Sequence, residues 1–121
     1  MTNTFMRILP GKGTSVEVEA SNLVEANAFT SDDHTELDQL YFATDDKNVT
    51  AGVWECAPCR EEIDSYPVHE MMTIISGSVT LTNKAGKIEV FTVGDVFFIP
   101  KGTQCTWQIT ETLRKMYMIA S

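Results

Sequence analysis

The stretch WECAPC, residues 54–59, places two cysteines on either side of an Ala-Pro dipeptide and is the first candidate for chemistry. Such a pair serves as a redox dithiol when it opens a helix, because the helix dipole lowers the pKa of the first thiol. Here the segment that follows, REEIDSYP, is acidic and typical of a loop, and acidic neighbours raise the pKa of a thiol. A structural zinc site would need a second pair, and only Cys105 is left. We therefore predict that Cys56 and Cys59 are strand-to-turn residues without a redox role, with an approach of Cys105 to either of them as the alternative.

Glu70 is the second candidate, because alternation along a strand would place it on the same face as Met72. By the same alternation, Cys105 shares a face with Trp107. A carboxylate held among aromatic side chains is a candidate general acid or base, and the alternative is that Glu70 only forms a structural hydrogen bond. His69 would point to the opposite face, so we do not expect it to belong to the same site.

The segments that must position these residues read as short strands separated by Gly, Pro and Asn. Few stretches show a helical period, and 21–29 is short enough for a turn or a single helical turn. NKAG at 83–86 predicts a hairpin turn, with Gly86 supplying the unusual dihedral. We expect buried strands at 71–76 and 95–100, and a final pair of strands that turns around Glu111 and Thr112. The expected strands are 15–20, 49–57, 71–76, 78–83, 87–93, 95–100, 105–110 and 114–119. Many short strands at close spacing predict an all-β sandwich or barrel.

The charge balance narrows the classes of partner. The 121 residues hold 9 Lys and Arg against 17 Asp and Glu, a formal net charge of −8. Such a field repels nucleic-acid phosphates and anionic lipid headgroups, so we expect no nucleic-acid and no membrane partner. No stretch has the length of a membrane-spanning helix, and the start lacks the apolar run of an export signal. We therefore expect a cytoplasmic protein with reduced thiols.

Two motifs resemble those of the cupin superfamily, a small jelly-roll β-barrel. The first, EMMTIISG, runs from Glu70 to Gly77, and the second, GDVFFIPKG, runs from Gly94 to Gly102. The ending TWQITETLRKMYMI is similar to that of the branch whose named member is (S)-ureidoglycine aminohydrolase. The resemblance implies an all-β, cupin-type jelly roll in a single domain, 1–121. Its N-terminal strands would fall in about 1–45 and its motif-bearing core in 50–119.

The resemblance also implies where a metal would bind, because most cupins hold a divalent metal through three histidines and a glutamate. The corresponding positions here are Asp64, Tyr66, Glu70 and Cys105. This set contains no imidazole and combines hard oxygen donors with one soft thiolate, which is unusual for a metal site. We therefore favour a barrel without a cofactor, and a divalent transition metal at these four positions is the alternative.

A metal-free barrel would still have a mouth lined by apolar side chains and a few polar groups, the usual composition of a small-molecule pocket. The resemblance places Tyr117 at a substrate-contacting position. We expect a small-molecule-binding cupin, with Glu70 as the candidate catalytic residue acting on a ureide, amino or carboxylate metabolite. The alternatives are a binding or sensing module without catalysis, or an interaction protein that forms a homodimer through exposed strand edges. The expected pocket residues are Tyr66, Glu70, Met72, Cys105, Trp107 and Tyr117.

Overall fold

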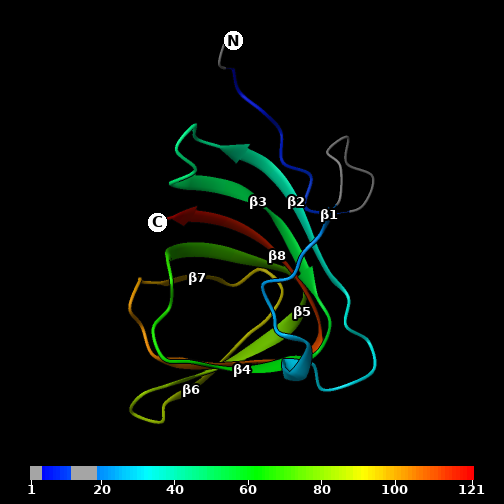
Figure 1. The fold of residues 1–121 in the computed structure, drawn as a ribbon, viewed down its shortest axis with the longest axis vertical. Helices are drawn as coiled ribbons and strands as arrows, with labels where there is room; N and C mark the ends of the chain where they lie inside the picture. The colour runs from blue at the N-terminus through cyan, green and yellow to red at the C-terminus, as the bar shows by residue number, and fades with distance from the viewer. Residues whose placement is uncertain (1–3, 12–18) are drawn as a thin grey trace.

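The computed structural model describes residues 4–11 and 19–121, and these form one rolled antiparallel sheet (Figure 1). The only helical element in these residues is a 3-10 turn, η1, at Ala26–Ala28. None of their helices is long and apolar enough to cross a membrane. The strands are β1 (Glu19–Ala20), β2 (Glu36–Ala43), β3 (Val49–Cys56), β4 (Cys59–Ile63), β5 (His69–Asn83), β6 (Ile88–Phe91), β7 (Val96–Ile99) and β8 (Cys105–Ala120). The all-β jelly-roll prediction is confirmed.

Two long strands hold the two faces of the roll together. The hydrogen-bonded order is β1-β2-β3-β8-β5-β6, while β4 pairs with β8 and β7 pairs with β5. The first half of β8 lies between β4 and β5, and its second half lies between β3 and β5. Both long strands therefore run through both faces of the roll and contribute to the core that it encloses (Figure 1).

The predicted turn around Glu111 and Thr112 is wrong, because β8 is continuous from Cys105 to Ala120. The bend occurs in β5 instead, where the register with β8 shifts between Ile74 and Val79. Gly77 lies at this bend with a φ of 75°, and a Cβ there would collide with the main-chain carbonyl of Thr112. A conformation that only glycine adopts easily thus lets β5 follow β8 around the corner.

The predicted buried strand at 95–100 is also corrected. β7 forms there, but Val96 is 61% and Phe98 is 55% exposed, because none of the described residues covers the outer face of the sheet at these positions. Likewise Met71, in the segment expected to be covered on both faces, is 47% exposed. The inward residues Met72 and Ile74 are buried as expected.

Several local predictions are confirmed. The hairpin between β5 and β6 turns at 83–86, with the amide of Asn83 donating to the carbonyl of Lys87 and Gly86 at a φ of 87°. η1 lies within the 21–29 segment that was expected to form a turn. The strand expected at 15–20 lies mostly outside the described residues, which include only its end, β1.

Candidate functional site

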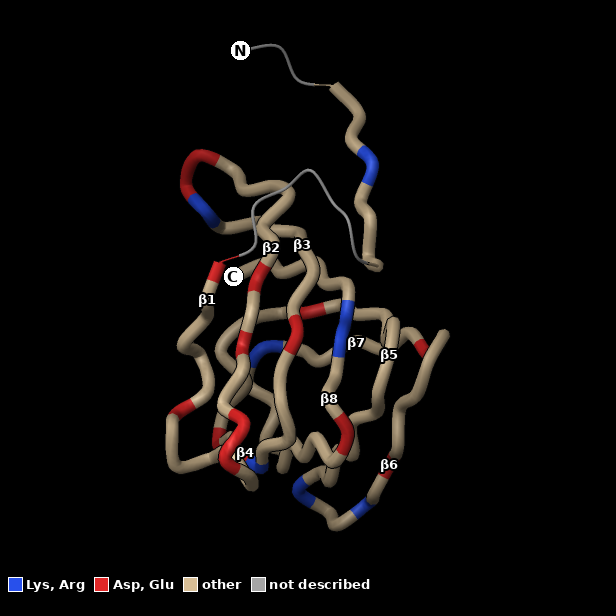
Figure 2. The backbone as a smooth tube through the Cα atoms, turned by 90° about the vertical axis from the view of Figure 1, so that its right-hand side faces the viewer, with Lys and Arg blue, Asp and Glu red and all other residues tan. Residues whose placement is uncertain are grey.

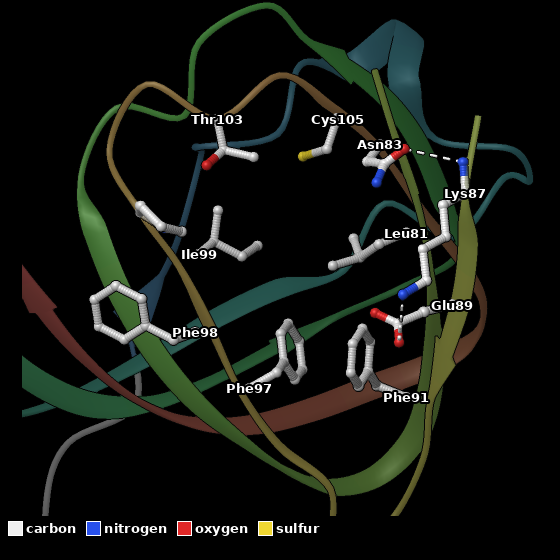
Figure 3. A pocket seen from close by; sticks show the side chains of 11 residues that line it. Leu81, Asn83, Lys87, Glu89, Phe91, Phe97, Phe98, Ile99, Thr103 and Cys105 are labelled. Carbon is white, nitrogen blue, oxygen red and sulfur yellow. Dashed lines mark hydrogen bonds and ion pairs between the residues drawn. The ribbon is translucent and has the colours of Figure 1, made fainter. Parts of the chain in front are cut away.

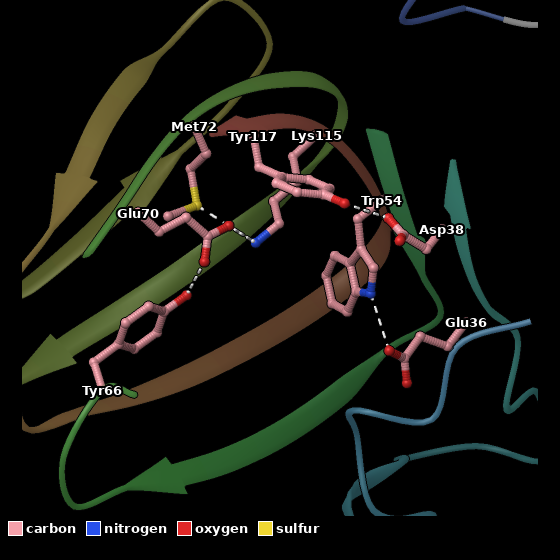
Figure 4. Close-up of polar contacts among 8 residues, drawn as sticks. All are labelled: Glu36, Asp38, Trp54, Tyr66, Glu70, Met72, Lys115 and Tyr117. Carbon is pink, nitrogen blue, oxygen red and sulfur yellow. Dashed lines mark hydrogen bonds and ion pairs between the residues drawn. The ribbon is translucent and has the colours of Figure 1, made fainter. Parts of the chain in front are cut away.

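A buried ion pair lies at the centre of the roll. The Lys115 ammonium is 2.7 Å from Oε2 of Glu70, and the Tyr66 hydroxyl donates to Oε1 of the same carboxylate at 2.6 Å (Figure 4). Glu70 is 4% and Lys115 is 6% exposed. Burial, together with the adjacent Glu70 carboxylate, raises the pKa of the Tyr66 hydroxyl, so Tyr66 remains a proton donor to Glu70.

The Lys115 ammonium also lies over two indole rings. Its Nζ is 4.7 Å from the centre of the Trp54 ring and 4.8 Å from that of Trp107, both within the range of cation–π attraction. The sulfur of Met72 is 3.6 Å from the same nitrogen. The charge is therefore held by one carboxylate and two aromatic faces.

Strand register explains why these side chains meet. Residues of β5 and β8 that are directly opposite share a face, and Met72 pairs with Tyr117 while Ile74 pairs with Lys115. Glu70 lies two residues before Met72, and therefore on the same inward face. Trp54 arrives from β3, where it pairs with Lys115 on the other side of β8.

A second set of polar contacts, made to acidic residues of β2, lies beside the ion pair (Figure 4). The Tyr117 hydroxyl donates to Asp38 at 2.7 Å, and the Trp54 indole N–H donates to Glu36 at 3.0 Å. Burial raises the pKa of Asp38, which the Tyr117 hydrogen bond only partly offsets. Glu36 is buried and also accepts from the backbone amides of Leu23 and Val24. Figure 2 shows acidic positions along β2 and a basic stretch on β8, with β3 between the two strands.

These groups line a cavity of about 370 Å³. Its walls are mostly apolar or aromatic, with four ionisable side chains among them, which is the usual composition of a small-molecule site. The ionisable residues are Asp38, Glu61, Glu70 and Lys115; the aromatic residues are Trp54, Tyr66, Trp107 and Tyr117; the apolar residues are Leu23, Val24, Ile63, Pro67, Val68 and Ile119.

The structure gathers most of the predicted pocket residues but separates one. Tyr66, Glu70, Trp107 and Tyr117 line this cavity, and Met72 lies behind it against Lys115. Cys105 lines instead a second cavity of about 290 Å³, where the rings of Phe91 and Phe97 stack 3.9 Å apart (Figure 3). The reason is position along β8: Cys105 pairs with Asn83 and Ile63 at the far end of the strand from Lys115.

Ten of the fourteen residues that line the main cavity were not predicted to do so, and four of these carry polar or charged groups: Asp38, Trp54, Glu61 and Lys115. Lys115 was not among the expected pocket residues. The signal for it was present, because alternation from Trp107 continues through Leu113 to Lys115 and Tyr117, all buried. No pattern within their own segments predicts that Asp38 and Trp54 line the cavity, because they reach it through the pairing of β2 with β3 and of β3 with β8.

The paired cysteines lie where β3 ends and β4 begins, as predicted. Cys56 and Cys59 are both free and fully buried, and no helix follows them. Hydrogen bonding from Cys59 and burial raise the pKa of Cys56. His69, also as predicted, faces away from Glu70: it is exposed, and its Nδ1 accepts from the amide of Lys101.

Comparison with known proteins places this arrangement in a family. A model described as the EutQ-like cupin domain matches residues 43–117. The chain belongs to the EutQ-like cupin family. No curated protein matches it.

Solved structures agree on the fold of this EutQ-like cupin. It is similar to the EutQ protein of Clostridium difficile, with a TM-score of 0.63 and 16% identity over 84% of this chain and 79% of that one. A cupin 2 conserved barrel protein of Rhodopseudomonas palustris matches with a TM-score of 0.68 and 17% identity, covering 96% of this chain and 79% of that one. A DUF861 protein of unknown function from Pseudomonas syringae pv. tomato matches with a TM-score of 0.68 and 25% identity over 88% of this chain and 45% of that one.

The residues of this EutQ-like cupin do not fit the metal centre that the superfamily implies. Among the described residues, no three His, Cys, Asp or Glu side chains gather in a way that could hold an ion. Asp64 is exposed, and Cys105 lines the other cavity. Both oxygens of Glu70 already have partners, Tyr66 and Lys115, so the positive charge beside this carboxylate is the chain's own ammonium.

Proposed function

We propose that this EutQ-like cupin binds a small polar metabolite in the cavity beside the Glu70–Lys115 ion pair, without a metal. The observation that carries the proposal is a charged pair, almost fully buried, that opens onto an aromatic-lined cavity of about 370 Å³. Buried charges are costly unless they are paired and hydrogen-bonded, as these are, and such groups cluster at functional sites. The candidate ligands are ureide, amino and carboxylate metabolites, in keeping with the resemblance to the (S)-ureidoglycine aminohydrolase branch.

The two tryptophans of the chain provide a direct test. Trp54 and Trp107 both line the cavity, so the two indole N–H resonances of a ¹⁵N-labelled sample report only on this site. A panel of ureides, amines and carboxylates should contain a compound that shifts these resonances saturably. The variant Val68→Trp, which fills the cavity from its rim, should abolish the shifts while keeping the fold. Saturable binding that this variant leaves unchanged would place the ligand elsewhere and reject the proposal.

Catalysis is a further element of the proposal, with Glu70 as the residue that accepts or donates a proton. Each carboxylate oxygen accepts one hydrogen bond, from Tyr66 or from Lys115, and keeps a further lone pair that can take a proton from a ligand. Glu70→Gln keeps the size of the side chain but removes this capacity. If a bound compound is turned over, this variant should lose turnover by at least about 10²-fold. Unchanged turnover would reject Glu70 as the residue that transfers the proton, and a panel in which compounds bind but none is turned over would leave a binding or sensing module.

A second candidate function, self-association, is favoured by an apolar row on the outer face of the sheet. Strand register places five side chains directly beside one another across β7, β5, β8, β3 and β2: Phe98, Met71, Met118, Ala51 and Phe42. The three central to this argument, Phe98, Met71 and Met118, are each about half exposed. Apolar side chains of the N-terminal segment are exposed as well, with Phe5 at 95%. A second copy of the chain would cover both surfaces.

Sedimentation velocity at micromolar concentration tests this candidate. The unmodified chain should sediment as a dimer, and Met71→Glu should convert it to a monomer. Val90→Glu is the matched control, because Val90 is equally exposed but lies on β6, away from the row. A monomeric unmodified chain would refute self-association.

A further inference from the structure

The charges that line the main cavity do not balance. Lys115 is neutralised by Glu70 at 2.7 Å. The two other carboxylates of the cavity, Asp38 and Glu61, form no ion pair with any residue in 4–11 or 19–121. The cavity therefore carries two carboxylates whose positive partner the described chain does not supply.

Because these two carboxylates are partly buried, their uncompensated negative charge is energetically unfavourable. Both are half-buried, and burial raises the pKa of each; for Glu61 the neighbouring Glu36 and Glu25 carboxylates add to the effect. The donors to Asp38 are both neutral groups, the Tyr117 hydroxyl and the backbone of Gln39. A cation in the cavity would remove this cost by supplying the missing charge and the missing donors.

An independent observation in the same cavity points to a ligand with a second kind of group. Trp107 lines the cavity and is 3% exposed, and its indole N–H has no hydrogen-bond partner among the described residues. By contrast, the other indole of the site, Trp54, is bonded to Glu36. A buried donor without an acceptor is rare and unfavourable, and an oxygen of a bound molecule would satisfy it.

We infer that the cavity is built for a small organic cation that also carries an oxygen acceptor. Its charged nitrogen lies toward Asp38 and Glu61, its oxygen toward the Trp107 indole N–H, and its apolar part against the aromatic walls. The inference rests on the proposed function and narrows its ligand class to amines with a hydroxyl or carbonyl oxygen. The volume of about 370 Å³ equals roughly a dozen waters at about 30 Å³ each, so a molecule of this kind fits.

Three probes of nearly equal size separate the contributions of charge: 4-aminobutan-1-ol, 1,4-butanediol and 4-hydroxybutyrate. Each is titrated into ¹⁵N-labelled protein at neutral pH, and the Trp107 indole resonance is followed. The amino alcohol should bind at least about tenfold more tightly than the diol, because hydrogen bonds to charged groups are the stronger ones. The hydroxy acid should bind most weakly.

Variants test whether Asp38 and Glu61 cause the preference for the amino alcohol over the diol. Asp38→Asn combined with Glu61→Gln should bring the affinity for the amino alcohol down to that for the diol and leave the diol unchanged. Glu62→Gln is the matched control, because Glu62 is exposed on the opposite face of β4 and pairs with Arg60. It should leave all three titrations unchanged.

The outcomes distinguish this inference from the proposed function. The inference is overturned if the diol or the hydroxy acid binds as tightly as the amino alcohol, if the double variant keeps the preference, or if none of the three probes shifts the Trp107 resonance. In each case the proposed function is still tested separately, by the wider panel of ureides, amines and carboxylates and by the Val68→Trp variant. If no compound of that panel binds, both are rejected.

Discussion

Removing the Lys115 ammonium should destabilise the fold more than any loss of a surface charge. Lys115→Met keeps most of the apolar volume but leaves the Glu70 carboxylate, 4% exposed, with Tyr66 as its one remaining partner. Breaking a buried ion pair by removing one partner costs about 3–5 kcal/mol. For a domain of this size, with about 4 °C per kcal/mol, the expected drop in Tm is roughly 12–20 °C.

A double-mutant cycle separates the pair from its surroundings. Glu70→Gln alone should also be destabilising, because it leaves Lys115 buried with only the two indoles and a neutral amide. The double variant should recover part of the loss, with a coupling of about 2–3 kcal/mol between the two positions. Urea unfolding followed by tryptophan fluorescence gives each free energy of unfolding, since both tryptophans contact the ammonium.

The control is an ion pair of the same chemistry at the surface. Lys87 and Glu89 are 3.8 Å apart with side chains 68% and 57% exposed, and Lys87→Met should change stability by at most about 1 kcal/mol. If Lys115→Met costs no more than this control, or if the two losses of the cycle simply add, then Glu70 and Lys115 do not depend on one another and the reasoning fails.

Three further predictions concern the walls of the site. Gly52→Ala should destabilise by about 2 kcal/mol or more in urea unfolding, because its Cβ would collide with a main-chain carbonyl of β2 and a tyrosine hydroxyl of the site. Trp54→Phe should cost about 1–3 kcal/mol more than Trp107→Phe in urea unfolding. Both variants lose the same ring volume from the core, but only Trp54 donates a hydrogen bond to a buried carboxylate, whereas the Trp107 indole N–H has no partner among the described residues; equal losses would contradict the hydrogen-bond assignment. Burial raises the pKa of Asp38 and Glu61 in the folded state, so the folded chain binds their protons more tightly than the unfolded chain does. The contribution of these two groups to the free energy of unfolding should therefore fall as the pH rises from about 4, the ordinary pKa of a carboxyl group, through the raised pKa values. A pH series of Tm should show this decline, and the Asp38→Asn, Glu61→Gln double variant should lack it.

Local patterns in the sequence predicted the fold well. One turn was predicted at the wrong place, however, and Lys115 at the centre of the site was therefore missed. The hairpin at 83–86 and the inward faces of β5 and early β8 followed from turn chemistry and alternation, which are local properties. A break expected at Glu111 and Thr112 interrupted that alternation, so Lys115 was not expected among the pocket residues. The continuous β8 carries the inward face from Trp107 to Tyr117 and buries the lysine with it.

The rest of the site depends on pairings between distant strands. Asp38 reaches the cavity because β2 pairs with β3 and β3 with β8, and Trp54 arrives by the same route. No spacing within one segment encodes these neighbours. The apolar segment 95–100 was misinterpreted for a related reason: its hydrophobicity indicated burial, but only one face of β7 lies toward the core, and outward side chains such as Phe98 remain exposed.

The path of β8 through both faces of the roll has a consequence for how the chain folds. Its partners in β3 and β4 precede it by about 40 to 70 residues, so the contacts that close the roll span much of the sequence. Chains dominated by such distant pairings fold slowly, in milliseconds to seconds, because a large loop must be ordered before any of them forms. Until β8 inserts, β3 and β5 present unpaired backbone to solvent and to other copies of the chain. The rate at which β8 inserts should therefore set how far refolding competes with aggregation as protein concentration rises.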